Sequence, residues 1–303
     1  MRFGGPFSLV ALPAACIGAS MATGCRSFSR SSVEPPPEAE LTFAYDAPAG
    51  GEAYECFGFD ASPIAGAYVT RIDWATPDGG TGAVLHHAGL YAYPDDYPDG
   101  PVTCDAMPVA WTMHVWYPGG DSLILPADVA LALPEGTRRF VVQAHVLRIA
   151  GGPAGAATVT LHATAQPPEH VATWLPAAGT VPALAPQQTQ TSSFTCEAAT
   201  QMHIVSTTPH MHELGRSFQG AVTGPDGSSA AIVDVPDWSF DEQKTYAVDR
   251  DVAPGDGVET TCTWTNFTDS EVLPGAASNE EMCAQALIVW PAQTAAWTSG
   301  PCL

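Results

Sequence analysis

Residues 138–166 read RRFVVQAHVLRIAGGPAGAATVTLHATAQ, and this stretch decides the fold class. Its two apolar runs, 138–149 and 157–166, are separated by the short turn AGGPAGA. Runs of Val, Ala, Leu and Thr bounded by Gly and Pro are typical of β-strands. Elsewhere, too, short apolar runs alternate with turn signals, and none keeps a helical period for three turns. The sequence therefore predicts an all-β protein.

The composition agrees with short strands joined by many turns. The chain has 303 residues, of which 46% are hydrophobic and only 14% charged, with 28 Gly and 28 Pro. That length suits two domains, and a Pro-rich, weakly periodic segment near the middle is a natural crossing between them. We expect two β-sandwiches, with an N-terminal domain over 41–166, a linker over 167–187 and a C-terminal domain over 188–303.

The N-terminus indicates export. Residues 1–24 contain one early Arg and then an apolar stretch of small residues, as in a signal peptide. The letters ATGC resemble the box before a lipid-modified cysteine of bacterial lipoproteins, so Cys25 is a candidate membrane tether. Residues 25–40 are rich in Ser, Pro and Glu and predict a disordered tether. We expect a bacterial periplasmic or cell-surface lipoprotein, or a secreted protein.

The charge excludes one class of partner. The chain carries 32 acidic and 10 basic residues, a net charge of −22, and its only lysine is Lys244. A nucleic-acid backbone needs Lys and Arg to replace its counterions, so nucleic acid is excluded as a partner. The negative field instead favours cations, either metal ions or amines.

Six cysteines remain once Cys16 and Cys25 are set aside. An even number in an exported chain indicates disulfides, and six cysteines allow 15 pairings. Spacing alone does not choose among these pairings. The six are Cys56, Cys104, Cys196, Cys262, Cys283 and Cys302.

Five histidines are candidate metal ligands. In STTPHMHELG, residues 206–215, His210 and His212 are two apart and would leave the same face of a strand. His86 and His87 are adjacent, so both can bind one ion only if the backbone bends or different ring nitrogens are used. His145 lies in an apolar strand, where a core histidine is the ordinary interpretation.

The order LHHAGLY, QAHV, HMH, EEMC resembles the copper type II, ascorbate-dependent monooxygenases, from about residue 54 to the C-terminus. The resemblance implies two antiparallel jelly-roll β-sandwich domains in tandem, with two copper ions facing each other across a solvent-filled cleft. The ligands of the first copper would be His86, His87 and His145. The ligands of the second would be His210, His212 and Met282, whose thioether suits a copper-selecting site.

The resemblance also implies a chemistry. The three-histidine copper would store and pass an electron, and the His–Met copper would activate O2 to hydroxylate a C–H bond of a small organic substrate. An electron donor such as ascorbate would be needed, and Gln143 matches a glutamine suggested to help link the two sites. The implied disulfides are Cys56–Cys104, Cys196–Cys302 and Cys262–Cys283.

Some positions depart from the peptide-hydroxylating branch of that family. Where that branch grips a carboxylate with Arg, Asn and Tyr, this chain has Thr208, Ala284 and Ala286. Thr cannot replace the paired donors of a guanidinium, so we expect that peptidylglycines are not substrates. Glu280 and Glu281 resemble the catecholamine-hydroxylating branch, which suggests an amine or aromatic substrate, although loop solvation explains two glutamates more simply.

Other functions compete with this interpretation. A non-catalytic copper-binding or copper-storing exported protein on the same fold is the main alternative. A blue-copper carrier needs a free Cys thiolate, which six paired cysteines would not leave. A zinc hydrolase could use three histidines but has no use for Met282. The remaining histidines are expected to be structural, namely His114, His162, His170 and His203.

Overall fold

The computed structural model describes residues 36–76, 83–104, 111–120, 122–148, 153–275, 277, 279–293, 296–299 and 302. The expected signal peptide and the candidate lipid anchor Cys25 lie outside the described residues. Residues 36–303 form one unit, and the fold below is the fold of that unit.

Strands account for almost all of the regular structure in the described residues, where the only helical element is one 3-10 turn, Ser62–Ile64. This confirms the all-β prediction. The strands are β1 (Glu38–Tyr45), β2 (Glu52–Asp60), β3 (Tyr68–Ala75), β4 (Ala83–Tyr93), β5 (Val102–Thr103), β6 (Trp111–Trp116), β7 (Leu123–Ile124), β8 (Val129–Ala132), β9 (Arg139–Arg148), β10 (Gly155–Thr164), β11 (His170–Ala178), β12 (Gln188–Ala198), β13 (Met202–His210), β14 (Gly215–Thr223), β15 (Ser229–Val235), β16 (Tyr246–Val252), β17 (Gly257–Asn266), β18 (Ala284–Trp290) and β19 (Trp297–Ser299).

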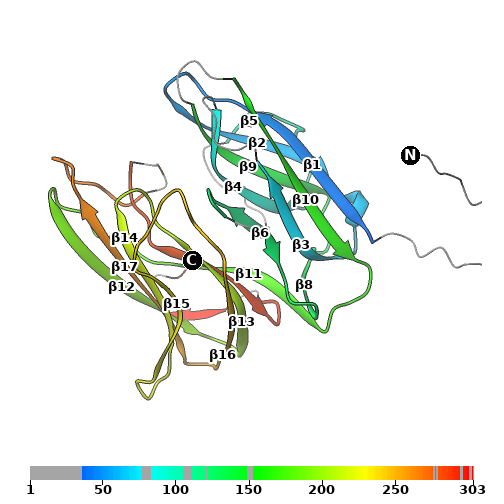
Figure 1. Cartoon of the computed structure of the whole chain (residues 1–303). Coiled ribbons are helices and arrows are strands. Elements are labelled where there is room, and N and C mark those ends of the chain that lie inside the picture. The colour runs from blue at the N-terminus through cyan, green and yellow to red at the C-terminus, as the bar shows by residue number, and fades with distance from the viewer. Residues whose placement is uncertain are drawn as a thin grey trace, which may run out of the picture. The chain divides into compact units, whose positions relative to one another are not determined.

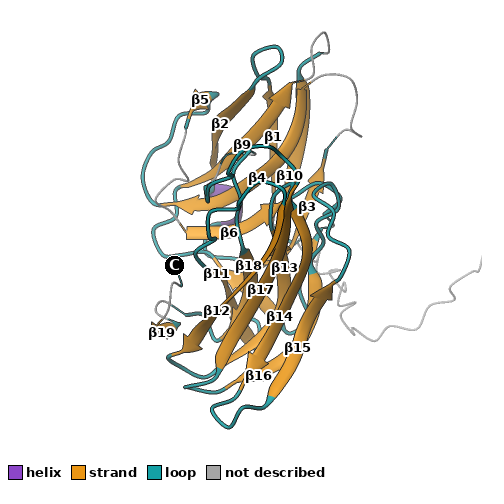
Figure 2. Cartoon of the chain, turned by 90° about the vertical axis from the view of Figure 1, so that its left-hand side faces the viewer, coloured by secondary structure: helices purple, strands orange, loops and turns teal. Residues whose placement is uncertain are grey.

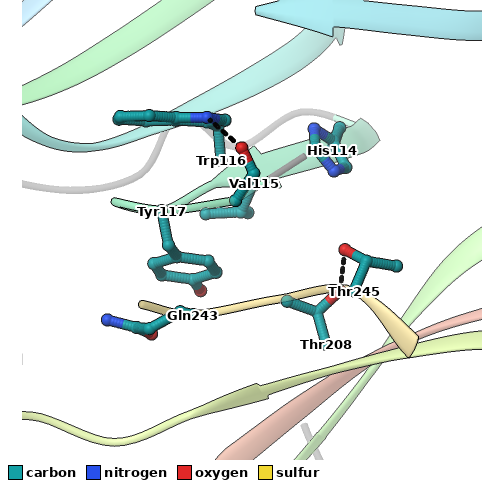
Figure 3. A pocket seen from close by; sticks show the side chains of 8 residues that line it. His114, Val115, Trp116, Tyr117, Thr208, Gln243 and Thr245 are labelled. Atoms are coloured by element: carbon teal, nitrogen blue, oxygen red, sulfur yellow. Dashed lines mark hydrogen bonds between the residues drawn. The ribbon is translucent and has the colours of Figure 1, made fainter. Parts of the chain in front are cut away.

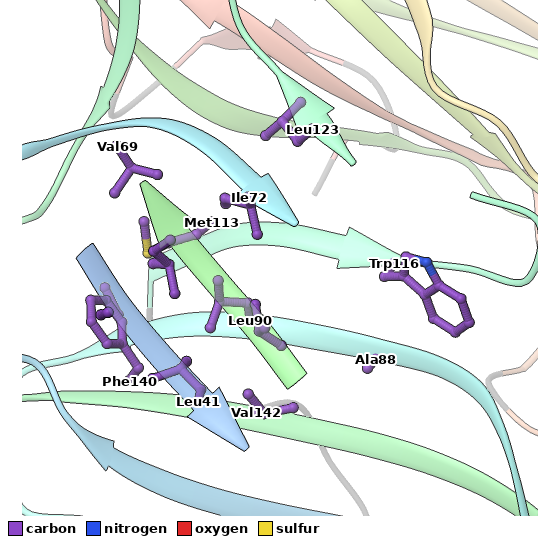
Figure 4. Close-up of a cluster of buried hydrophobic side chains, with 14 of the residues drawn as sticks. Leu41, Val69, Ile72, Ala88, Leu90, Met113, Trp116, Leu123, Phe140 and Val142 are labelled. Carbon is purple, nitrogen blue, oxygen red and sulfur yellow. The ribbon is translucent and has the colours of Figure 1, made fainter. Parts of the chain in front are cut away.

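The N-terminal half packs one sheet on another. A five-stranded sheet in the order β5-β2-β9-β4-β6 faces the strands β1-β10-β3-β8 of a nine-stranded sheet (Figure 1). Side chains alternate along β1, where Leu41 and Phe43 point inward and their neighbours are exposed, as a half-buried strand requires. They meet Leu90, Phe140 and Val142 from the smaller sheet in one apolar core (Figure 4).

The C-terminal half repeats this plan. A second five-stranded sheet, in the order β15-β14-β17-β12-β19, packs against β11-β18-β13-β16 of the large sheet (Figure 2). Phe218 and Trp264 are fully buried between these layers. The sandwich-like, mainly antiparallel sheets fit the predicted architecture, and the jelly-roll connectivity remains a prediction.

Three disulfides lock the strands together. They join Cys56 to Cys104, Cys196 to Cys302 and Cys262 to Cys283. The pairing implied by the family resemblance is therefore confirmed. The last bridge holds the end of the loop before β18 against β17, directly beside Met282.

Strand β11 lies inside the segment expected to link the two domains. It pairs in parallel with β8, where His170 lies opposite Val129, and antiparallel with β18, where Thr173 lies opposite Val289. One sheet therefore runs through both halves. At the other end of the fold, β1 begins at Glu38, within the last residues expected to be a tether. Among the described residues, no helix is long and apolar enough to cross a bilayer.

Candidate metal centres

His86, His87 and His145 come together at one point on the smaller sheet of the N-terminal half. In β4, the pairing register with β9 shifts between Leu85 and His87, and His87 lies directly opposite His145. A bulge of this kind adds one residue and redirects side chains, so both adjacent histidines can face the same point. The bend that the sequence argument required is present.

The ring nitrogens of this group converge. The Nδ1 atom of His86 lies 3.1 Å from Nδ1 of His87 and 3.2 Å from Nδ1 of His145, and the last two are 3.4 Å apart. A neutral imidazole has one N–H and one acceptor nitrogen, so few protons can sit between three converging nitrogens. Lone pairs therefore face each other here, and a bound cation would satisfy them. The donor set fits a metal such as copper.

Burial keeps these imidazoles neutral. It lowers the pKa of His86 to about 3, helped by the nearby His145 and His212. It also lowers the pKa of His87 well below the ordinary value and lowers that of His145, although Glu52 acts in the opposite direction on His145. Imidazole binds metals in its deprotonated form. The group is therefore ready to bind metal at neutral pH.

Two residues of β2 support His145 from its outer side. The carboxylate Oε2 of Glu52 lies 3.0 Å from Nε2 of His145, and the ring of Tyr54 stacks on the His145 ring with centroids 4.2 Å apart. Burial raises the pKa of Tyr54 to about 12, with Glu52 and Glu280 adding to the shift. Neither Glu52 nor Tyr54 belongs to the ligand pattern expected from the sequence, although both lie on one strand face two residues apart.

The second pair, His210 and His212, lies at the end of β13. The strand ends at His210, and His212 follows in the turn, yet their ring centroids are 5.1 Å apart. Nδ1 of His210 is 2.8 Å from Oε1 of Gln243, and Nδ1 of His212 is 2.9 Å from the carbonyl oxygen of Glu280. Both acceptors engage Nδ1–H, which leaves each Nε2 with a lone pair for a metal. Burial lowers the pKa of His210 to about 3.

The buried carboxylate of Glu281 holds the segments that carry the second group together. Its side chain is 1% exposed and accepts hydrogen bonds from the backbone N–H groups of His212, Leu214 and Met282 and from Nε1 of Trp264. Burial raises its pKa to about 7, while the four donors act in the opposite direction. Loop solvation, the simpler explanation from the sequence, is therefore wrong for Glu281.

Met282 is held close to this pair through its backbone. Its N–H donates to the same Glu281 oxygen that accepts from the N–H of His212, at 3.2 and 3.0 Å. Its side chain is half-buried, and the neighbouring Cys283 is fixed by its disulfide. The third ligand position of the second centre remains a prediction.

The two histidine groups are in ring contact with each other. The ring centroids of His87 and His210 are 6.4 Å apart, and Tyr117 stacks on His210 at 4.5 Å and lies 6.0 Å from His87. Phe240 lies 4.4 Å from the His86 ring and 6.2 Å from that of His212. The family resemblance implies a solvent-filled cleft, whereas aromatic side chains pack between the groups here.

A narrow crevice lies beside Tyr117 (Figure 3), whose ring also stacks on His210. Thr208 and Thr245 share a hydrogen bond of 2.8 Å along its wall, and Gln243 closes it beside them. The residues that line it are uncharged at neutral pH, because burial lowers the pKa of His114 to about 4. The crevice offers hydroxyl and amide groups but no cation for a carboxylate.

The other expected residues lie outside the two groups. Gln143 is buried on β9 and donates to the carbonyl oxygen of Cys104, 3.2 Å away. His114 accepts a hydrogen bond from Nε1 of Trp74, and His162 pairs with Glu38 and Asp73. His170 and His203 both stack on Trp290.

Sequence reasoning missed Tyr117, Phe240 and Gln243, which join the two groups. Tyr117 directly follows β6, and the other two lie in the loop before β16. The backbone N–H of Gln243 donates to the carbonyl oxygen of Pro118, which ties these two segments together. None of the three belongs to a recognisable pattern in the sequence, so only the fold reveals them.

Comparison with known proteins agrees with the site. Residues 174–298, less than half of the chain, match the family described as copper type II ascorbate-dependent monooxygenase, C-terminal domain. The match includes His210, His212 and Met282 and confirms the resemblance over the C-terminal half. It implies copper as the metal and O2 and ascorbate as co-reactants. No curated protein matches the chain.

Similarity to solved structures is distant. The major capsid protein P2 of bacteriophage PM2 is 8% identical with a TM-score of 0.35, and the match covers 86% of this chain and 98% of that one. The VP2 subviral particle of infectious bursal disease virus is 12% identical with a TM-score of 0.23, covering 87% of this chain and 74% of that one. Scores this low carry no argument about function.

Proposed function

We propose that the whole chain is an exported dicopper monooxygenase, which hydroxylates a C–H bond of a small organic molecule with O2 and an electron donor such as ascorbate. The observation that carries this proposal is the pairing of two histidine groups, one from each half of the chain. The family match of the C-terminal half supports copper at this place.

Two separate sets of residues would each hold one metal ion. His86, His87 and His145 would hold the first ion through their converging Nδ1 atoms. His210 and His212 would hold the second ion through Nε2, with the sulfur of Met282. Copper, when bound, supplies the one-electron chemistry that O2 reduction requires. Gln243 and the Glu280 carbonyl hold the second pair in the required tautomer, and Tyr117 and Phe240 keep bulk water from between the groups.

The first test combines metal analysis with oxygen uptake. The full chain, loaded with copper, should bind about two ions, as two separate ligand sets predict. Ascorbate should then drive O2 consumption and give a hydroxylated product from a panel of small amines and neutral aromatics. Replacing His203, a histidine outside both groups, by Ala should leave the copper content unchanged. Copper binding without O2 consumption would instead favour a copper-binding or copper-storing protein.

The second test concerns substrate class. Thr208 stands where the peptide-hydroxylating branch has an Arg, and its hydroxyl is paired with that of Thr245 rather than with a cation. A peptide that ends in glycine should therefore give no hydroxylated product under conditions in which a small amine or aromatic does. Product from the peptide, analysed by mass spectrometry with copper and ascorbate present, would contradict this exclusion.

A further inference from the structure

Glu52 lies beside the first histidine group and is not one of its converging donors. Strands β2 and β9 are antiparallel neighbours, with Tyr54 directly opposite His145 and Glu52 opposite Leu147. This register brings the Glu52 carboxylate within 3.0 Å of Nε2 of His145. The side chain of His145 is 1% exposed, whereas that of Glu52 is 39% exposed. The carboxylate therefore reaches in from the edge of the site.

The two nitrogens of the His145 ring face different partners. Nδ1 faces His86 and His87 at 3.2 and 3.4 Å, and Nε2 faces the Glu52 carboxylate. An ionised carboxylate only accepts hydrogen bonds, so Nε2 carries the proton and Nδ1 keeps its lone pair. The parallel ring of Tyr54, tilted by 3° from that of His145, fixes the plane in which Nδ1 points.

We propose that Glu52 is the positioning residue of the first metal centre. Its carboxylate sets the tautomer and orientation of His145 and makes the imidazole a stronger donor, as carboxylate partners of metal-binding histidines do. Its negative charge also favours the more highly charged Cu(II) over Cu(I) at this centre. The inference rests on the proposed function, because it takes the first group to be a copper site.

The test measures the affinities of Cu(II) and Cu(I) separately. The full chain carrying His212→Ala serves as the parent, so that the first centre is measured without the second. Adding Glu52→Gln keeps the size of the side chain and an acceptor oxygen but removes the charge. We expect the Cu(II) affinity to fall on the order of 10- to 100-fold, as for other outer partners of metal ligands. The Cu(I) affinity should fall less, so the reduction potential should rise.

The matched control is Glu55→Gln in the same parent. Glu55 lies on the same strand opposite Ala144, and its carboxylate accepts from the N–H of Asp46 rather than from a histidine. This control removes the same charge and should leave both affinities at the parent values. Because Glu52 and Glu55 are both at least partly exposed, both variants should melt at the parent temperature.

Two results would overturn the inference. Equal Cu(II) affinities for the Glu52 and Glu55 variants would remove the positioning role and leave the proposed function intact. An equal loss of Cu(I) and Cu(II) affinity in Glu52→Gln would overturn the preference for Cu(II) assigned to the carboxylate charge. A parent that binds no copper at the first centre would instead overturn the proposed function, and this inference with it.

Discussion

Replacing Met282 by Ala should abolish ascorbate-driven hydroxylation and leave copper at the first centre. Under the proposed function, the two imidazoles of His210 and His212 would remain as ligands, but the soft thioether expected to select copper would be lost. The copper content should fall to about one ion, since the first group has its own three donors. Copper analysis, together with O2 uptake in the presence of ascorbate, measures both effects.

Met282→Leu is the matched variant for this test. Leucine fills a similar volume without a sulfur, and such exchanges cost little packing energy, below about 1.5 kcal/mol. We expect Met282→Leu to lose hydroxylation as completely as Met282→Ala while keeping the melting temperature. Full turnover in the leucine variant would show that the sulfur is not a ligand. Loss of both ions together would show that the two centres depend on each other.

Replacing Glu281 by Ala should lower the free energy of unfolding more than any other substitution proposed for this protein. Three donors distant from it in the sequence, the N–H groups of His212 and Leu214 and Nε1 of Trp264, would lose their acceptor in a buried setting. A buried donor left without a partner costs about 1–3 kcal/mol, so the three donors together should cost roughly 3–9 kcal/mol of unfolding free energy. Thermal unfolding should shift down by about 10 °C or more.

The neighbouring glutamate provides the control. The Glu280 side chain accepts from the N–H of Ala277, and the Glu280 backbone carbonyl, which holds His212, survives any side-chain change. Glu280→Ala should therefore cost about 1 kcal/mol or less. Glu281→Gln should lie between the two, because its amide group would turn N–H toward donors that need an acceptor. Equal melting temperatures for the two alanine variants would contradict the role assigned to Glu281.

The sequence predicted much of the fold because its strand signals are local. Apolar runs between Gly and Pro clusters indicated strands, and the family resemblance supplied the disulfide pairing. Strand β11 was harder to predict, because it lies in a Pro-rich, weakly periodic segment. Its strand character comes from pairing with β8, which precedes it in the sequence, and with β18, which follows it. Both partners are distant in the sequence, so the local pattern does not reveal the pairing.

The histidine groups show where local arguments stop. His86 and His87 depend on a bulge, and a bulge is set by pairing with β9 rather than by residues 86 and 87. An unbroken strand would place His203 and His210, which are seven residues apart, on opposite faces, but β13 is irregular between Ile204 and Ser206. His203 nevertheless lies away from the site, because it stacks on Trp290 and pairs with Asp251.

Glu281 and Gln243 illustrate a different limit. In the sequence, each is a polar residue in a loop, and nothing there distinguishes a solvated side chain from a buried acceptor. Both residues are 1% exposed. The fold surrounds Glu281 with hydrogen-bond donors and places Gln243 against the His210 imidazole. Buried polar groups of this kind are specified by tertiary contacts, which a pattern of residue types does not contain.

Strand β11 also determines how the molecule can be dissected. It is hydrogen-bonded on one side to β8 and on the other to β18. Any cut that places β11 in one half therefore removes its hydrogen bonds to the partner strand in the other half. A recombinant fragment of either half would display an unprotected strand edge, the kind of surface on which polypeptides aggregate. Studies of one histidine group are therefore better made by point substitution in the intact chain than by truncation.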